Sequence, residues 1–120
     1  MAKTLGEFEQ LVLFALLYLG EDNAYGVTIR EAIEERTGRT VSSGAVYTAL
    51  DRLEDQQLVA SWSSEPTTER GGRRKRLFRL EPLGLKALEK SVRTFQNMSE
   101  GLIPLIGQRL AATGSEEEGA

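Results

Sequence analysis

The sequence predicts a mainly α-helical fold with three helices, a β-hairpin and a further helix, and three observations support it. Apolar residues recur every three or four positions up to about residue 55 and again from residue 82, the periodicity of amphipathic helices. Between residues 58 and 80, two short runs rich in apolar residues flank a loop, which is typical of a hairpin. The length of 120 residues fits one domain with a core of ordinary size.

The first helix is expected from Thr4 to Leu19. Its second half is apolar on nearly all sides, which indicates burial from two directions, and the sequence GEDN at residues 20–23 ends it. A second helix is expected from about Tyr25 to Arg36, with Thr37 and Gly38 forming its C-terminal cap.

The third helix is expected to follow Val41, with Ser42 or Ser43 as its N-cap. An apolar stripe would hold this helix against the core; its members are Val46, Ala49, Leu50 and Leu53. The opposite face carries small, hydroxylated and aromatic side chains instead of the Glu/Lys mixture of a merely solvated surface. That composition makes the face a candidate for binding.

The hairpin is predicted to pair residues 58–62 with residues 76–80 around a loop at residues 66–72. In its second strand, Phe78 and Leu80 are expected to alternate toward the core. Such a long tip in a small domain is more often functional than accidental.

Pro82 suits the first turn of the last helix. Beyond it, apolar residues recur in alternating steps of three and four, a heptad-like seam. Gly101 and Pro104 predict a kink or break in this helix near residues 101–104. We therefore divide the chain into a first unit at 1–81 that holds three helices and the hairpin, a C-terminal helix at 82–111 and a disordered acidic tail at 112–120.

The composition excludes much common enzyme chemistry. The chain has no cysteine and no histidine, which removes disulfides, thiolate nucleophiles, Cys/His zinc sites and histidine-dependent catalysis. Its carboxylates are scattered on predicted helix surfaces, so we expect no enzyme activity, no metal and no cofactor. The longest apolar run, from Leu11 to Leu19, is about half of what a membrane span needs, and no signal pattern precedes it. A cytoplasmic protein without a membrane partner is expected.

Positive charge is concentrated on the predicted hairpin. Between Pro66 and Leu80, six cations stand against the single anion Glu69, although the whole chain has a formal charge of -3. Because salt screens charges beyond roughly 8 to 10 Å, this segment creates its own positive field. Three helices followed by a basic hairpin form a winged helix-turn-helix, an architecture that reads double-stranded DNA.

This architecture assigns separate roles to the third helix and the hairpin. The helix would enter the major groove and contact bases or flanking phosphates through Ser42, Ser43, Gly44, Tyr47, Thr48 and Arg52. The hairpin tip, or wing, would bind phosphates or enter the minor groove through Arg70, Gly71, Gly72, Arg73, Arg74, Lys75 and Arg76. Tyr25 is an additional candidate for a DNA contact.

Four short motifs resemble the PadR-like transcriptional regulators of bacteria. They are the Tyr25-Gly26 pair, the Gly-x-x-Tyr pattern from Gly44 to Tyr47, the Arg-Leu-Glu sequence at 52–54, and the basic run from Gly72 to Phe78. With the N-terminal helix, the resemblance covers about residues 5–88, and the order and spacing of the motifs make it specific. It implies a winged-helix repressor that dimerises through its N- and C-terminal helices and responds to a small, commonly aromatic effector.

The chain departs from the family pattern at two places. Glu81 precedes Pro82 where the family usually has a threonine, a better N-cap. The C-terminal part is short, as in the smaller members, so a large ligand-binding domain is not expected.

The seam and the aromatic residues suggest two further surfaces. A homodimer is expected to form through Leu88, Val92, Phe95, Leu102 and Ile106, although the first three also suit an intramolecular core. An effector pocket is expected to involve Phe8, Phe14, Tyr18 and Phe95.

Several alternatives stay open at this point. The wing is also readable as a solvated loop, and Tyr47 as an aromatic that fills space between helices. Trp62 fits hairpin packing better than effector binding. A winged helix that binds proteins without specific DNA recognition is the alternative function.

Overall fold

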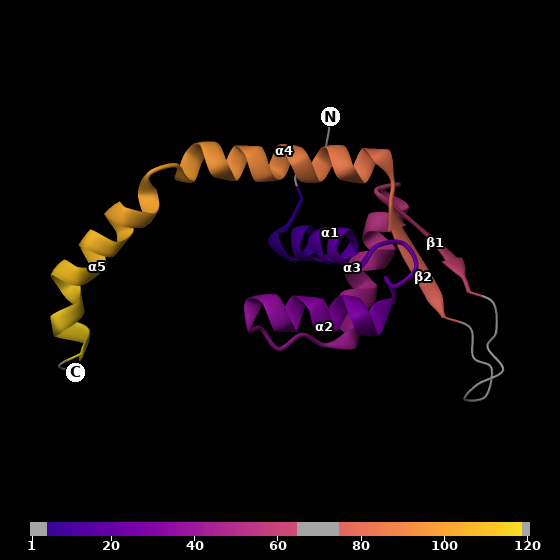
Figure 1. The fold of residues 1–120 in the computed structure, drawn as a ribbon, viewed down its shortest axis with the longest axis horizontal. Coiled ribbons are helices and arrows are strands. Elements are labelled where there is room, and N and C mark those ends of the chain that lie inside the picture. The colour runs from indigo at the N-terminus through magenta and orange to yellow at the C-terminus, as the bar shows by residue number, and fades with distance from the viewer. Residues whose placement is uncertain (1–4, 65–74, 119–120) are drawn as a thin grey trace.

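The computed structural model describes residues 5–64 and 75–118, and its described part is mainly helical with one antiparallel hairpin, as predicted (Figure 1). The elements are α1 (Glu7–Leu19), α2 (Gly26–Thr37), α3 (Ser43–Asp55), β1 (Val59–Ser63), β2 (Arg76–Leu80), α4 (Pro82–Ser99) and α5 (Leu102–Glu118).

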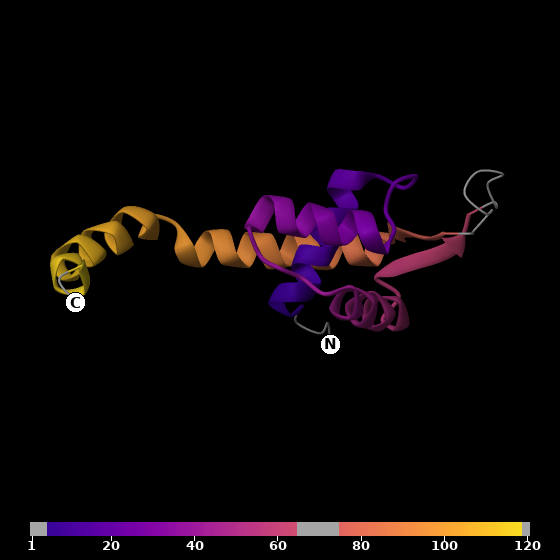
Figure 2. The ribbon, with the colours of Figure 1, turned by 90° about the horizontal axis from the view of Figure 1, so that it is seen from below.

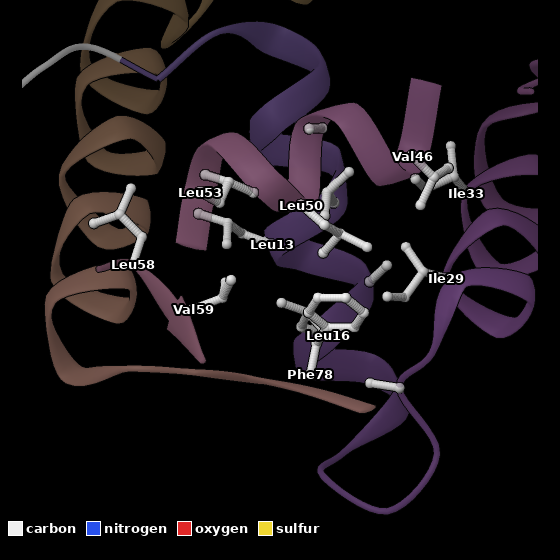
Figure 3. Close-up of a cluster of buried hydrophobic side chains, with 14 of the residues drawn as sticks. Leu13, Leu16, Ile29, Ile33, Val46, Leu50, Leu53, Leu58, Val59 and Phe78 are labelled. Carbon is white, nitrogen blue, oxygen red and sulfur yellow. The ribbon is translucent and has the colours of Figure 1, made fainter. Parts of the chain in front are cut away.

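The core lies where α1, α2 and α3 meet beneath the hairpin (Figure 3). Leu13 of α1, Ile29 of α2 and Leu50 of α3 are fully buried there, together with Phe78 of β2. The apolar residues of each helix thus lie on one face, and the three faces meet in a common core. Burying one side chain of this size stabilises the folded protein by about 1.5 to 3 kcal/mol.

Helix α1 packs against α2, α3, α4 and β2. In its second half Leu13, Ala15 and Leu16 are buried, whereas Leu17 and Tyr18 are 52% and 58% exposed, so the predicted burial from two directions holds for only part of its surface.

Local capping interactions place the starts of α2 and α3. Ser42 is the N-cap of α3, because its hydroxyl accepts a hydrogen bond of 3.1 Å from the backbone N–H of Ala45. At the start of α2, the backbone N–H of Tyr25 donates to the hydroxyl of Thr28 at 3.1 Å. These bonds satisfy donors that a helix leaves unpaired at its N-terminus.

The hairpin joins Val59 to Leu80 and Ser63 to Arg76 as its outermost pairs. It is also attached to the loop before α2, because the N–H of Phe78 donates to the carbonyl of Ala24 at 2.8 Å. Leu77 is only 9% exposed although it points to the face opposite Phe78. The predicted alternation of Phe78 and Leu80 is therefore incomplete, since both faces of this strand are covered and Leu80 is only half-buried.

Helix α4 crosses over α1, and its start is fixed against the hairpin (Figures 1 and 2). A Cβ atom at Gly84 would lie 2.0 Å from the carbonyl oxygen of Leu58, so only glycine lets the helix approach this closely. Glu81, where the family usually has threonine, makes no side-chain cap bond with the described part of the chain.

The chain then turns at Glu100 and Gly101, and α5 points away from the three-helix body. The sequence predicted a kink or break near residues 101–104, and the helix is interrupted at Glu100 and Gly101, at the N-terminal edge of that range. The acidic segment from residue 112 differs from the predicted disordered tail, because α5 continues to Glu118. Alanine and glutamate are good helix formers, so polarity alone did not exclude a helix there. None of the helices in the described ranges is long and apolar enough to cross a membrane.

Candidate nucleic-acid interface

The outer face of α3 exposes most of the side chains predicted to contact DNA. Ser42, Ser43, Thr48 and Arg52 are exposed, and Gly44 faces open space, with no described atom within 4 Å of where a Cβ would lie. The opposite stripe of α3 is fully in the core (Figure 3). The helix therefore presents a polar ridge whose position is fixed by its buried side.

Tyr47 occupies the middle of this ridge and also packs between helices. Its side chain is 39% exposed, and its hydroxyl lies against Gly26 at the start of α2. The alternative interpretation, in which the Tyr47 ring fills space between helices, therefore describes part of its environment. The remaining exposed part of the side chain is available to a partner.

Arg52 lies near a carboxylate of α1. Its Nη1 atom is 3.8 Å from Oε2 of Glu9, a long ion pair between an exposed arginine and a carboxylate side chain that is only 12% exposed. Phe8, Thr48 and Arg52 line one shallow groove between α1 and α3. Phe8 is consequently on the α3 side of α1.

Tyr25 and Lys75 meet where α2 adjoins the base of the wing. The Lys75 ammonium lies 4.3 Å from the centre of the Tyr25 ring, within the range of a cation–π interaction. The N–H of Lys75 donates to the hydroxyl of Ser64 at 2.9 Å, and the N–H of Ser64 donates to the carbonyl of Lys75 at 2.8 Å. These contacts fix the point from which the wing leaves the body.

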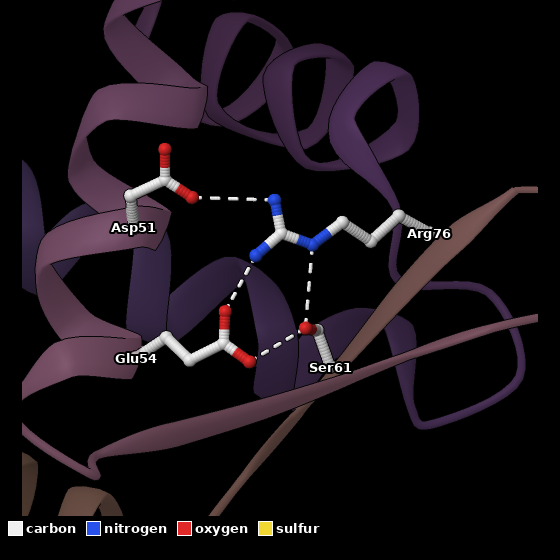
Figure 4. A network of polar contacts seen from close by, with 4 residues as sticks. All are labelled: Asp51, Glu54, Ser61 and Arg76. Carbon is white, nitrogen blue, oxygen red and sulfur yellow. Dashed lines mark hydrogen bonds and ion pairs between the residues drawn. The ribbon is translucent and has the colours of Figure 1, made fainter.

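Arg76 has an environment that the sequence did not predict (Figure 4). Its guanidinium contacts Asp51 and Glu54 of α3, and the hydroxyl of Ser61 on β1. The expectation that Arg76 binds phosphate is not supported by this arrangement, because its nitrogens already have acceptors within the chain. Sequence reasoning missed Asp51, Glu54 and Ser61 as partners; the Arg-Leu-Glu motif at 52–54 marked Glu54 but not what it binds.

The same contacts perturb the acidity of Glu54. The hydrogen bond from Ser61 is the largest cause that holds the pKa of Glu54 below its ordinary value; burial opposes it, and the hydrogen bond and charge of Arg76 lower the pKa further. Glu54 is therefore a stable carboxylate at neutral pH.

The other wing residues, Arg70, Gly71, Gly72, Arg73 and Arg74, lie outside the described residues. Their role as phosphate contacts stays a prediction. Among the described residues, no cluster of acidic side chains has the arrangement of a metal site.

The predicted dimerisation residues fall into two groups. Leu88 is 2% exposed and belongs to the core of its own chain, which corrects its assignment to a dimer contact. Val92 is half-buried against the same core. Phe95, Leu102 and Ile106 are exposed, as a contact between two copies requires.

The four aromatic residues assigned to an effector pocket do not share one cavity. Phe14 and Phe95 line a groove of about 840 Å³ between α1 and α4. Phe14 also lines a smaller cavity of about 270 Å³ between α1 and α2 with Tyr18, whose ring lies 3.5 Å from the guanidinium of Arg36. Phe8 lies in neither, because it faces α3.

Comparison with known proteins places this arrangement in a family. The model of the transcriptional regulator PadR-like family matches residues 15–90. A 37.1 kDa uncharacterised protein in transposon TN4556 of Streptomyces fradiae is 34% identical over 87 residues, which cover 72% of this chain. The chain spans 23% of that protein's length.

Solved structures share the fold at lower sequence identity. A PadR family transcription regulator from Clostridium difficile R20291 superposes with a TM-score of 0.68 at 24% identity, covering 84% of this chain and 99% of that chain. Bacillus subtilis PadR in complex with operator DNA gives a TM-score of 0.60 at 20% identity, covering 71% of this chain and 46% of that chain. The resemblance found in the motifs is thereby confirmed: the chain belongs to the PadR-like family of transcriptional regulators.

Proposed function

We propose that the protein is a sequence-specific repressor that binds double-stranded DNA as a homodimer. In this proposal α3 lies in the major groove, and the basic wing binds phosphates or enters the minor groove. A small apolar or aromatic effector relieves repression.

The observation that carries the proposal is a series of contacts that leads from α3 to the base of the wing. Tyr47 on the exposed ridge touches Gly26, its neighbour Tyr25 lies beneath the Lys75 ammonium, and Lys75 continues into the basic segment. Groups suited to base edges thus adjoin groups suited to phosphates. The operator-bound structure of Bacillus subtilis PadR supports the proposal, because it has this fold on DNA.

The homodimer is supported by apolar side chains on α4 and α5 that the described part of their own chain leaves uncovered. Phe95, Met98 and Ile103 are 69%, 78% and 77% exposed, an unusual density of large apolar groups on a water-facing surface. A second copy related by two-fold symmetry would cover them and set two α3 helices against half-sites about 34 to 36 Å apart.

The effector proposal rests on the groove between α1 and α4. Its lining includes the apolar side chains Leu11, Phe14, Val92 and Phe95 and the polar side chains Lys90 and Gln96. Mostly apolar grooves with a few polar groups are typical of small-molecule sites. Because the groove adjoins the proposed dimer contacts, an effector there would alter the spacing of the two α3 helices.

Selection of bound duplexes from a random pool tests the DNA proposal, since it reports the site, its symmetry and its half-site spacing together. Titration at several salt concentrations should then give a slope of log K against log salt of about -7, from roughly eight phosphates per dimer. Equally weak, salt-insensitive binding to the selected and scrambled duplexes would contradict the proposal. If a pull-down recovered one stoichiometric protein partner and no duplex were bound specifically, the chain would be a winged helix that binds a protein.

A further inference from the structure

The Arg76 side chain joins three elements that the chain brings together from separate places (Figure 4). Its Nη1 atom lies 3.2 Å from a carboxylate oxygen of Asp51, and its Nη2 atom donates to Glu54, both on α3. Its Nε atom lies 3.3 Å from the hydroxyl of Ser61 on β1. Each guanidinium nitrogen therefore has an acceptor on a neighbouring element.

The acceptors are also connected to one another. The Ser61 hydroxyl donates to the second carboxylate oxygen of Glu54 at 2.6 Å, which closes a cycle between Arg76, Glu54 and Ser61. The ring of Phe78, fully buried in the core, lies 4.8 Å from the guanidinium carbon. The planar guanidinium of an arginine, whose N–H donors point in fixed directions, suits such a site, whereas the ammonium of a lysine would act as a single point charge.

The position of this cycle links the two halves of the proposed DNA surface. Arg76 follows Lys75 directly at the base of the wing, while Asp51 and Glu54 lie in the C-terminal half of α3. Without Arg76, two carboxylates would remain uncompensated on the helix that approaches the DNA polyanion. Like charges at such a contact oppose binding.

We propose that Arg76 is a positioning residue that orients the wing against α3 and neutralises Asp51 and Glu54, and is not a phosphate contact. This inference rests on the proposed DNA-binding function. It distinguishes Arg76 from the neighbouring basic residues, which the sequence alone groups with it.

Arg79 provides a matched control on the same strand. It is a half-exposed arginine like Arg76, but its carboxylate neighbours are distant, with Glu81 at 3.8 Å and Glu21 at 4.0 Å. Neither of these carboxylates belongs to α3. Arg76→Met and Arg79→Met therefore remove the same charge from β2, and only the first breaks the ion pairs with that helix.

Hydrogen exchange of the protein without DNA tests the orienting role. Arg76→Met should raise amide exchange in β1 and β2 by about tenfold, with α1 unchanged, whereas Arg79→Met should leave the hairpin close to wild type. Arg76→Lys keeps the positive charge but lacks the planar guanidinium with its several donors. It should therefore also raise amide exchange in β1 and β2. Trp62, the single tryptophan and a neighbour of Ser61 and Ser63 on β1, gives a second readout through its fluorescence anisotropy for the Arg76 variants only, because Arg79 itself lies 5.7 Å from the centre of its ring. Wild-type hairpin protection in Arg76→Met and Arg76→Lys would overturn the orienting role.

A double-mutant cycle with DNA tests the neutralising role. In the wild-type background, Glu54→Gln should weaken binding about threefold, because it disturbs the cycle. In the Arg76→Met background, it should strengthen binding about threefold, because it removes an uncompensated carboxylate. Arg76→Met alone should leave the salt slope unchanged.

The alternative role predicts a different pattern. If Arg76 binds a phosphate, its replacement should reduce the salt slope by about one for each phosphate that it neutralises, and Glu54→Gln should strengthen binding equally in both backgrounds. That outcome would overturn the neutralising role. If the wild-type protein binds no duplex, the proposed function fails, and the exchange experiment still decides whether Arg76 holds the wing to α3.

Discussion

The hydroxyl of Tyr47 on α3 lies against Gly26 at the start of α2, so closely that a Cβ atom at Gly26 would be 2.3 Å from it. This contact packs α3 against the start of α2 while leaving part of the tyrosine exposed. It also explains why the Tyr-Gly and Gly-x-x-Tyr motifs, separate in sequence, occur in the same chain.

Gly26→Ala should destabilise the protein by about 1 to 3 kcal/mol, because the added methyl group overlaps the tyrosine and forces it to move. Denaturant unfolding measures this change. In a Tyr47→Ala background the same substitution should become neutral or stabilising, since alanine is the better helix former once the overlap is removed. Gly44→Ala, where the added atom meets open space, is the control and should not destabilise the fold. Equal destabilisation by Gly26→Ala in both backgrounds would contradict the contact.

Neutralising Arg73, Arg74 and Lys75 together should weaken binding to every duplex and flatten its salt dependence, because phosphate contacts carry affinity without sequence information. Substitutions at Ser43, Tyr47 or Thr48 should instead change which sequence is preferred, by about 1 to 3 kcal/mol for each base pair that is no longer discriminated. Anisotropy titrations with selected and scrambled duplexes at several salt levels separate the two effects. A wing variant that changes only sequence preference would show that this division of roles is wrong.

Lowering the pH should destabilise the wild-type protein more than Glu54→Gln. The pKa of Glu54 is depressed in the folded state, so the stability from its pairing is fully present above the pKa of the unfolded chain, about pH 4, and is lost as pH falls through the lower folded pKa. Melting temperatures measured between pH 7 and pH 3 at low salt check this. A glutamine variant whose melting temperature falls in parallel with that of the wild type would exclude the contribution.

Phe95→Glu or Ile103→Glu should convert a dimer into a monomer, because each places a charge on the apolar face of α4 and α5 that a second copy would cover. Sedimentation equilibrium measures the mass directly. Val27→Glu changes a similarly exposed apolar residue on α2 and should leave the mass unchanged. A wild-type monomer at micromolar concentration, or a dimer that tolerates both charges, would contradict the proposed interface.

The elements of the fold were readable from the sequence because their signals are local. The N-cap serine at 42 and the buried stripe from Val46 to Leu53 act within a turn or two of one another, so the spacing of residues records them. The exposed ridge of α3 followed from the same periodicity. The order of three helices and a basic hairpin added the expectation that this ridge reads DNA, and the family motifs pointed the same way.

Tertiary structure alone decided which side chains meet across these elements. Arg76 and Asp51 are 25 positions apart, and the helix and strand periodicities that place each residue on a face do not determine how helix and hairpin are oriented to each other. The heptad-like seam likewise placed Leu88 and Phe95 on one face of α4, but only the packing of α1 determined that Leu88 is covered and Phe95 is not. Local sequence therefore determined the elements and their faces. The long-range packing of α3, α4 and the hairpin determined that one arginine of the basic segment is held by carboxylates of its own chain.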